Sequence, residues 1–438
     1  IIPLELFETR RLLGAVVGLI GLAVTWRLAR RVGGPLAGLA TLLLLALCPI
    51  FYGHMFMNPK DAPFAVSMVI LMLGLVRLAE EYPKPSPRTV LIIGLGAGLS
   101  IGCRILGGLA LVYAMVGFLP LLIEDVRTQG ARKAIHRFGH VVYVLLPGLV
   151  FGYLVMGLVW PWSIIKPGNP LQALTYFSHF FEKPWKEMFD GALVSVPDMP
   201  WSYLPTLFAL QLPEVLIGLL VAAIVVTFMS LARKDVPSRR KTILLMLTMA
   251  ATLPLVIAMV KRPALYNGIR HFIFVIPPMA VLAGAAFAWT MEWLKVNHRR
   301  WQPAAMAVFS FGLLLPLSEM IRLHPYEYTH FNHIAGTVRS ANNFFMLDYW
   351  GLALKQASDG LREDLVERQR PAQVALGPEF TIGWDSQSAD FAMTLGEFYC
   401  KGLTAPVMVE IKRDDVVFAR VYDIRGRGIS TLLAIPAP

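Results

Sequence analysis

The chain has 438 residues, of which 56% are hydrophobic and only 16% are charged, and its mean hydropathy is +0.58. Soluble domains average closer to half apolar and a quarter charged, so this composition excludes an ordinary soluble protein. The formal net charge is +11, and the basic residues gather in short connections between apolar runs. That distribution is typical of a membrane protein with positively charged loops on one side, and it argues against a nucleic-acid partner.

Ten apolar runs predict membrane-spanning helices, for which about 20 residues are needed. They are residues 11–29, 34–52, 62–79, 89–103, 105–123, 140–161, 213–232, 243–260, 271–294 and 303–321. The fourth and fifth are short and rich in glycine, so we expect them to pack closely as a pair through small residues. The predicted fold class is therefore mainly α, a polytopic transmembrane helical bundle.

The connections between the spans divide into two sets. One set is short and rich in Lys and Arg, which places it in the cytoplasm; it comprises residues 27–31, 80–88, 124–137, 233–241 and 295–300. The other set then lies outside, and it comprises the region around Lys60, the turn at Arg104, residues 162–212, residues 261–270 and everything after 322. Residue 1 also falls outside, so we expect at least one span and one external loop to precede Ile1.

Two external regions have a composition of their own. Residues 162–212 are rich in aromatic residues and proline, and apolar spacing around 170–190 predicts an amphipathic helix at the membrane surface. After residue 322 a helix is predicted over 347–369, and strands over 372–377, 407–413, 416–424 and 430–436. We therefore predict a membrane module of residues 1–321 and a small C-terminal extracytoplasmic α/β domain of residues 322–438.

Ionisable residues gather at the outer ends of the spans and are nearly absent from their middles. They are His54, Lys60, Asp61, Arg104, Lys261, Arg262, Arg270 and His271. Charges at this depth are costly unless they reach water or serve a purpose. A cationic ring at headgroup depth suits a lipid phosphate or pyrophosphate, because the planar fork of Arg fits a phosphate group.

Plainer interpretations of the same residues remain open. Asp61 could cap the start of the third span, Arg104 could extend to the interface, and Lys261 and Arg262 could be interfacial anchors. The stretch "YNGIRHF", residues 266–272, favours a site more strongly, because it combines a turn, an amide and two basic groups. Tyr266 and Asn267 therefore join the predicted site. Three acids of the 162–212 loop are expected to be solvated, although one could serve the site; they are Glu187, Asp190 and Asp198.

The order of these segments resembles the GT-C superfamily and, more narrowly, the bacterial relatives of protein O-mannosyltransferases and of the aminoarabinose transferase of lipid A. Four features carry the resemblance: the paired runs of residues 10–54, "NPKDAPF" at 58–64, the short glycine-rich spans around Arg104, and "IRHFIFVIPPMAVLAG" at 269–284. The likeness covers roughly residues 5–125 and 262–295.

The resemblance implies a membrane glycosyltransferase whose donor is a sugar on a polyprenyl phosphate, or less often a diphosphate. Such enzymes usually invert the anomeric carbon: a carboxylate of the first external loop acts as base on the acceptor hydroxyl, and cationic side chains stabilise the leaving lipid phosphate. The first visible span matches the family's second, so the principal acid is expected before Ile1. Asp61 then matches a supporting acid, with Lys60 and His54 beside it.

The remaining candidates, which the topology places on the same outer face, are expected to bind the lipid phosphate. They are Asn58, Arg104, Tyr266, Asn267, Arg270 and His271. A divalent metal, Mg or Mn, is used by some members of the superfamily, and Asp61 and His54 could contribute to such a site. The expected partners are the polyprenyl-phosphate sugar donor, a glycan, lipid or protein acceptor, and the bilayer. The expected location is the bacterial inner (plasma) membrane, with the site facing the periplasm or exterior.

Two other functions stay open. A transporter or lipid flippase would need ionisable residues near the bilayer midplane and often has inverted repeats; neither is evident, which favours the transferase. An inactive relative could act as a scaffold. Residues 324–351, rich in aromatics and histidine, could bind sugar or pack the outer domain on the membrane module. Asp348, Tyr349 and Trp350 are the candidates there.

Overall fold

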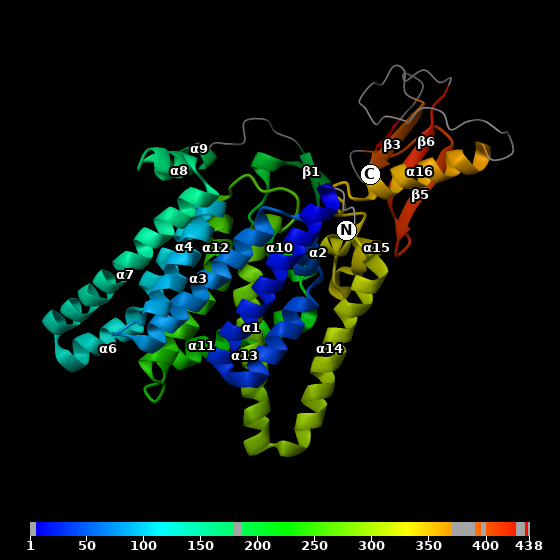
Figure 1. Ribbon diagram of the computed structural model, residues 1–438. Helices are drawn as coiled ribbons and strands as arrows, with labels where there is room; N and C mark the ends of the chain where they lie inside the picture. Colours follow the sequence, from blue (N-terminus) through cyan, green and yellow to red (C-terminus); the bar gives the residue numbers. More distant parts are fainter. Residues whose placement is uncertain (1–5, 179–185, 370–389, 396–399, 426–433, 437–438) are drawn as a thin grey trace, which may run out of the picture.

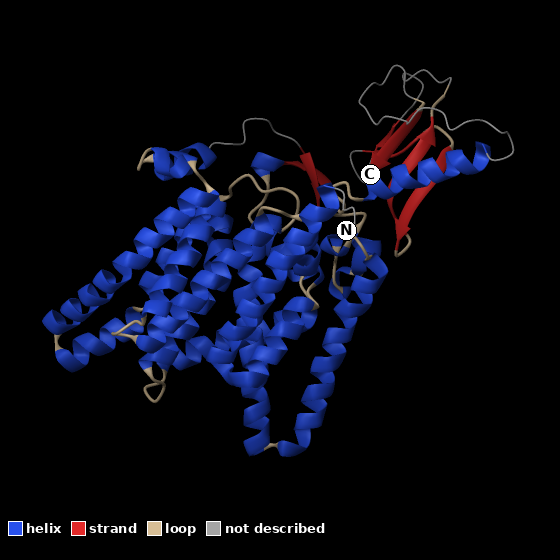
Figure 2. Cartoon of the chain, in the orientation of Figure 1, coloured by secondary structure: helices blue, strands red, loops and turns tan. Residues whose placement is uncertain are grey.

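The computed structural model describes residues 6–178, 186–369, 390–395, 400–425 and 434–436. Most of these residues form helices, and strands gather at one end of the molecule (Figure 2). The α-helices are α1 (Leu6–Ala46), α2 (Pro49–Met57), α3 (Asp61–Glu81), α4 (Pro87–Cys103), α5 (Leu109–Gly117), α6 (Leu119–Gln129), α7 (Ala131–Val159), α8 (Trp162–Ile165), α9 (Asn169–Ser178), α10 (Tyr203–Gln211), α11 (Glu214–Ala232), α12 (Ser238–Lys261), α13 (Ile276–Asn297), α14 (Gln302–Leu323), α15 (Thr337–Ala341) and α16 (Ala353–Gln369).

Short 3-10 helices and strands complete the chain. The 3-10 helices are η1 (Ile105–Gly108), η2 (Val196–Asp198), η3 (Arg270–Val275), η4 (Arg299–Trp301), η5 (Glu327–Thr329) and η6 (His333–Ala335). The strands are β1 (Lys186–Phe189), β2 (Ala192–Ser195), β3 (Phe391–Leu395), β4 (Cys400–Leu403), β5 (Val407–Arg413), β6 (Val416–Asp423) and β7 (Ala434–Pro436).

Eight helical segments of the described chain are long and apolar enough to cross a membrane, which makes this an integral membrane protein. All ten predicted runs fall on helices. The first of the eight segments, Glu8–Ala46, contains the first predicted run and most of the second, and the fourth predicted run lies on the 17-residue α4. The predicted fold class, a mainly helical membrane bundle with a small α/β unit at the C-terminus, is confirmed.

Helix α1 folds back on itself at Gly34. This residue has φ 81° and ψ −171°, a conformation that a residue with a side chain rarely adopts, and Pro35 follows it. The chain then returns beside its own start, because a Cβ on Gly14 would lie 2.5 Å from the carbonyl oxygen of Met55 in α2. The kink thus joins the first two predicted runs and brings the end of α2 to the same end of the bundle as the N-terminus.

Helix α13 forms the centre of the bundle. Nearly every residue from Ile276 to Ala288 is buried, and many of them are Ala or Gly. Small side chains let neighbouring helices approach closely. Thr41 of α1 donates a hydrogen bond to the Ala280 carbonyl at 3.1 Å. The segment before α13, which includes η3, packs in turn against α3 and α12.

The glycines of α4 pack against α7. A Cβ on Gly94 would lie 2.1 Å from the carbonyl oxygen of Gly148, and a Cβ on Gly98 would lie 2.3 Å from that of Gly152. The expectation that the two short glycine-rich spans pair through these residues is therefore wrong for α4, whose small face meets α7. The chain after Arg104 instead turns sharply through η1, where Gly107 lies against Ser100 at the end of α4.

The two predicted sets of connections lie at opposite ends of the bundle (Figure 1). The α6–α7, α11–α12 and α13–α14 connections, all basic, lie at the lower end in this view. Helices α8, α9 and α10, strand β1 and the C-terminal unit lie at the other end. The sequence pattern of Lys and Arg therefore sorted the loops correctly into two groups.

The loop of residues 162–212 differs in part from its prediction. Helix α9 is amphipathic and exposes Leu171, Leu174 and Tyr176, as a surface-lying helix would. It ends at Ser178, however, and residues 186–195 form an antiparallel hairpin in which Phe189 pairs with Ala192. Asp190 and Gly191 turn the chain with positive φ, which Asp-Gly accommodates readily. Phe181 and Trp185, also assigned to the predicted helix, and His179 lie outside the described residues.

The C-terminal unit places α16 against an antiparallel sheet of order β3-β6-β5 (Figure 1). The predicted strands over 407–413 and 416–424 are confirmed as β5 and β6, in which Ile411 pairs with Ala419. The end of the strand predicted over 430–436 is present as β7, paired with β4. Residues 430–433 and the strand predicted over 372–377 lie outside the described residues. Helix α16 begins at Ala353, six residues later than predicted, because residues 347–352 reach into the bundle. The domain boundary at residue 321 stays a prediction.

Aromatic and ionic contacts attach this unit to the bundle. Tyr326 stacks on Phe418 with ring centroids 5.0 Å apart, and Arg413 donates to the His324 carbonyl at 2.8 Å. Arg339 pairs with Asp414 at 2.8 Å in the β5–β6 turn. Much of the 324–351 region thus serves packing, which was one of its two predicted roles.

Candidate functional site

The segment between α2 and α3 holds Asp61 in a fixed, buried position. The Asn58 side-chain oxygen accepts from the backbone N–H of Lys60 at 3.2 Å and of Asp61 at 2.8 Å. The Asn58 amide nitrogen donates to the Asp61 carboxylate at 2.7 Å. Asp61 is only 2% exposed and occupies the first turn of α3, where a negative charge is favourable. Asn58 is therefore an organiser of this turn, and its amide is already committed to Asp61.

Arg104 forms an ion pair with Asp61. It comes from the junction between α4 and η1, where the chain leaves the helix in an extended conformation. Burial, and then the nearby charge of Arg270, lowers the pKa of Arg104 to about 10, so it stays charged near neutral pH. Its Nε is buried and has no hydrogen-bond partner among the described residues. Arg104 therefore does more than extend to the interface, since the fold holds it against a buried acid.

Arg270 lies between two aromatic rings at the start of η3. Its guanidinium carbon lies 4.7 Å from the ring centre of Tyr266 and 5.2 Å from that of Trp350, both within cation–π range. Its Nε, like that of Arg104, is buried without a partner in the described part of the chain. His271 meets the Tyr266 ring edge-on at 4.8 Å. The "YNGIRHF" stretch thus supplies the site with Arg270, a cation that contacts the rings of Tyr266 and Trp350.

His54 links α2 to the loop before α16. Asn58 donates toward its Nδ1 at 3.3 Å, and its Nε2 lies 3.1 Å from the Tyr349 hydroxyl. Because the orientation of the Asn58 amide is fixed by its bonds to Lys60 and Asp61, Nδ1 is an acceptor and the ring proton belongs on Nε2. Burial, and then the charge of Arg270, lowers the pKa of His54 to about 3. His54 is therefore a neutral imidazole that positions Tyr349.

Lys60 is the exposed cation of the cluster. Burial, and then the charges of Arg104 and Arg270, lowers the pKa of its ammonium group, which places the group close to both guanidinium groups. It has no ion pair in the ranges that the structure describes. Lys261 and Arg262 are exposed, and Arg262 donates to the Met199 carbonyl at 3.4 Å. Their interpretation as interfacial residues fits these positions better than a site role.

Glu187 of β1 is a buried residue of this region that sequence reasoning placed in solvent. It is 3% exposed and accepts from the Tyr203 hydroxyl at 2.7 Å and from the Asn267 N–H at 2.6 Å. Tyr203 also accepts from the Gly268 N–H at 2.9 Å. Burial raises the pKa of Glu187 although these donors oppose the rise. The expectation of a solvated acid is wrong here, because the hairpin turns Glu187 inward.

Glu187 therefore fixes the backbone turn that precedes Arg270. Asn267 and Gly268 both have positive φ, 59° and 67°, and their N–H groups point to the carboxylate and the Tyr203 hydroxyl. The described contact of Asn267 is thus made by its backbone. The signal that could have revealed Glu187 is the Asp-Gly pair three residues later, which predicts a hairpin in place of the helix.

The structure brings the predicted residues to one end of the bundle, around Asp61. Three cations, Lys60, Arg104 and Arg270, face two acids, Asp61 and Glu187, and His54 is neutral. Two buried guanidinium N–H groups have no partner in the described chain. Buried donors of this kind normally find an acceptor. The arrangement can therefore bind an anion with several acceptor oxygens, such as a phosphate.

A divalent metal fits these residues poorly. The described residues contain no group of three or more His, Cys, Asp or Glu side chains that could hold a metal ion. The Asp61 carboxylate is committed to Arg104 and Asn58, and both ring nitrogens of His54 face protein partners. We assign no step to a metal, and metal dependence stays a prediction.

No curated protein matches the sequence. Two solved structures are similar at low identity, both of ArnT from Cupriavidus metallidurans. The apo state has a TM-score of 0.44 and 20% identity over 72% of this chain and 50% of that one. The form bound to undecaprenyl phosphate has a TM-score of 0.40 and 18% identity over 73% and 59%. The chain thus spans only about half the length of these proteins.

The N-terminal part of the chain matches a protein family. Residues 7–160 match the model of the dolichyl-phosphate-mannose-protein mannosyltransferase family. This range contains His54, Asn58, Lys60, Asp61 and Arg104, so one half of the site falls within the match. Over residues 7–160 the predicted resemblance to protein O-mannosyltransferases is confirmed.

Proposed function

We propose that this protein transfers a sugar from a polyprenyl-phosphate donor to an acceptor hydroxyl. The observation that carries the proposal is the cationic cluster of Lys60, Arg104 and Arg270, two of which have a buried N–H without a partner in the described chain. A phosphate group supplies the acceptor oxygens that these donors lack. The family matched by residues 7–160 is named for dolichyl-phosphate-mannose, a polyprenyl-type phosphate donor, which supports the same ligand class.

The proposed reaction needs little covalent chemistry from the residues at hand. The bond between the anomeric carbon and the phosphate oxygen breaks, and the lipid phosphate leaves with the bonding electrons. Lys60, Arg104 and Arg270 stabilise the charge that grows on that oxygen. The acceptor oxygen bonds to the opposite face of the anomeric carbon, which inverts it, and passes its proton to a carboxylate base. Asp61 is committed to Arg104, so it positions that guanidinium, and we assign the base to no residue of the described chain.

The proposed location follows from the basic connections. The short loops rich in Lys and Arg gather at the end opposite to the site, and such loops face the cytoplasm. We therefore place the site at the periplasmic or exterior surface of a bacterial inner membrane. Substrate lipid would reach it from the bilayer, and the acceptor, a glycan, lipid or protein hydroxyl, would reach it from the aqueous side.

The direct test uses full-length protein in proteoliposomes with a radiolabelled sugar on a synthetic polyprenyl phosphate. Transfer to an acceptor, or slow hydrolysis to free sugar, supports the proposal. Asp61→Asn, Lys60→Ala and Arg270→Ala should each lower turnover. Unchanged turnover in all three would show that the site is assigned wrongly even if the protein is a transferase.

A transporter or flippase is the second candidate. The same proteoliposomes distinguish it, since uptake or flipping of the lipid-linked sugar without any covalent product would replace our proposal. Binding of polyprenyl phosphate with neither transfer nor movement would favour an inactive scaffold.

A further inference from the structure

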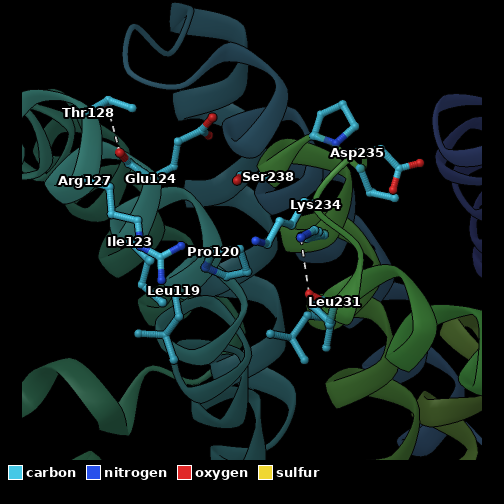
Figure 3. Close-up of a pocket in the computed structure, with 14 residues that line it drawn as sticks. Leu119, Pro120, Ile123, Glu124, Arg127, Thr128, Leu231, Lys234, Asp235 and Ser238 are labelled. Atoms are coloured by element: carbon cyan, nitrogen blue, oxygen red, sulfur yellow. Dashed lines mark hydrogen bonds between the residues drawn. The ribbon is translucent and has the colours of Figure 1, made fainter.

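A second cationic region lies at the other end of the bundle, in a pocket of about 660 Å³ between α6 and the α11–α12 connection. Figure 3 shows Arg127 of α6 and Lys234 of the connection facing one another across it. The pocket is far from the cluster around Asp61, which lies at the opposite end of the helices (Figure 1). It therefore takes no part in the proposed transfer.

The walls of the pocket combine apolar and basic surface. Leu119 and Ile123 of α6 are 46% and 47% exposed, and together with Leu231 of α11 and Leu245 of α12 they line one part of it. Helix α6 is amphipathic, and Arg127 follows Leu119 and Ile123 at intervals of four residues, so all three lie on the face that lines the pocket. The lining thus matches a molecule with an apolar body and an anionic head.

The basic side chains of the pocket differ in how far they are already used. Lys241 donates to the carbonyl oxygens of Leu231, at 3.2 Å, and Arg233, and so caps the end of α11. Asp235 accepts from Nε and Nη2 of Arg233, at 3.0 Å and 2.6 Å. Arg127 and Lys234 have no hydrogen-bond or ion-pair partner within the described chain. Two cations of the lining therefore remain available to a ligand. Of the two acids in the lining, Asp235 is paired and only Glu124 is left to oppose them.

The position of the pocket relative to the membrane selects the ligand. Helices α11 and α12 are both membrane-spanning candidates, and the pocket lies where one ends and the other begins. That depth is occupied by lipid headgroups. Basic pockets between spans at the positively charged end of a bundle suit anionic lipid headgroups. We propose that this pocket binds an anionic phospholipid, with its phosphate between Arg127 and Lys234 and its acyl chains along Leu119, Ile123 and Leu245.

The test compares two variants that remove the same charge from the same end of the protein. Arg127→Gln/Lys234→Gln empties the pocket of its free cations, and Arg132→Gln/Lys133→Gln, at the exposed start of α7, leaves the pocket intact. The full chain in detergent is titrated with phosphatidylglycerol, and bound lipid is counted by native mass spectrometry. We expect the pocket variant to bind roughly tenfold more weakly or worse, and the control to bind within about twofold of wild type.

Several outcomes would overturn the proposal. Equal weakening in both variants would mean a diffuse surface charge, and unchanged binding in both would mean that the pocket is not the site. Glycerophosphoglycerol, which is the phosphatidylglycerol headgroup without its acyl chains, should not compete at matched concentration; if it does, the pocket is a site for a free phosphodiester and not for a lipid. Thermal unfolding in phosphatidylcholine checks that the variants fold, and Lys234→Gln alone is the fallback because it alters one exposed loop residue.

Discussion

The two ends of the bundle use the same pair of residue types in opposite ways. At one end Arg104 pairs with Asp61, and their side chains are 17% and 3% exposed. At the other end Arg233 pairs with Asp235, and theirs are 61% and 64% exposed. A solvated ion pair changes the stability of the fold little. The desolvation penalty of a buried ion pair, in contrast, must be offset by the attraction between its charges and by further hydrogen bonds. Charge at the first end is therefore built into the structure, whereas charge at the second end lies in solvent-exposed connections.

Arginine–aromatic contacts repeat the same contrast. Arg270 lies between Tyr266 and Trp350, which come from segments about 80 residues apart. Arg300 lies over the ring of Trp301, its own neighbour in sequence, at 5.8 Å. Only the first contact requires the C-terminal region to be in place. The site is thus completed by residues 349–350, and this suggests that the C-terminal unit matters for function as well as for packing.

The largest expected effect comes from breaking the buried pair. Arg104→Ala leaves the Asp61 carboxylate buried without its cation, which costs about 3–5 kcal/mol of stability for pairs of this kind. Thermal unfolding in detergent should shift down strongly. Arg233→Ala is the matched control and should leave the unfolding temperature unchanged.

A double variant then tests whether the loss of stability in Arg104→Ala arises from the unpaired, buried charge of Asp61. Asp61→Asn/Arg104→Gln should recover much of the lost stability, because it removes both charges together. If Arg104→Ala unfolds at the temperature of Arg233→Ala, the pair is not buried in the way described here.

The next effect concerns transfer activity. Arg270→Ala should lower kcat/KM by about 100-fold or more, because a preorganised cation that faces a leaving phosphate contributes roughly 3–4 kcal/mol to catalysis. Arg270→Lys should recover only part of the activity, since an ammonium group cannot stack between two rings as a guanidinium does. Labelled-sugar transfer measures both.

Arg300→Ala serves as the control at the other end and should transfer sugar at the wild-type rate. A loss in that variant equal to the loss in Arg270→Ala would mean that removing a surface cation anywhere disturbs the protein, and the contrast between the two ends would fail.

A smaller effect is expected from the acid that positions Arg270. Glu187→Ala removes the acceptor for the Asn267 N–H and the Tyr203 hydroxyl, and each buried donor left unsatisfied costs about 1–3 kcal/mol. We expect a lower unfolding temperature together with a lower kcat, because Arg270 follows that turn. Asp198→Ala, an exposed acid in the same loop, should change neither. Equal unfolding temperatures and equal kcat values in the two variants would mean that Glu187 is a solvated acid, as the sequence predicted.

The sequence was sufficient for the features that depend on composition and local periodicity. All ten apolar runs that hydropathy located fall on helices, and the Lys and Arg of the short loops separated the two ends of the bundle. Topology then placed Lys60, Asp61, Arg104 and Arg270 together, because the ends of spans that share a side must share a surface. These inferences need no knowledge of which helix touches which.

The sequence was insufficient where the outcome depends on a partner far along the chain. The glycines of α4 could meet α5 or α7, and no local pattern decides between them. Tyr349 and Trp350 reach His54 and Arg270 across almost 300 and 80 residues, and Glu187 is buried only because a hairpin replaces a helix. Such contacts are set by tertiary packing, which short-range pattern does not encode.

The last prediction concerns pH and the buried imidazole of His54. Its pKa is lowered to about 3 in the folded protein, whereas a free histidine titrates near 6.5. Between these values the unfolded chain binds the proton and the folded one does not, so stability is lost as pH falls through about 6.5. One such group lowers the free energy of unfolding by about 1 kcal/mol between pH 6.5 and 5.5.

His54→Gln should therefore flatten the fall in unfolding temperature over this range. Burial also lowers the pKa of His330 to about 3, so His330 contributes equally to the pH dependence of wild type and of His54→Gln. His136→Gln, which alters a histidine exposed at the other end, should leave the slope as it is, and a slope that His54→Gln does not change would mean that His54 is hydrated.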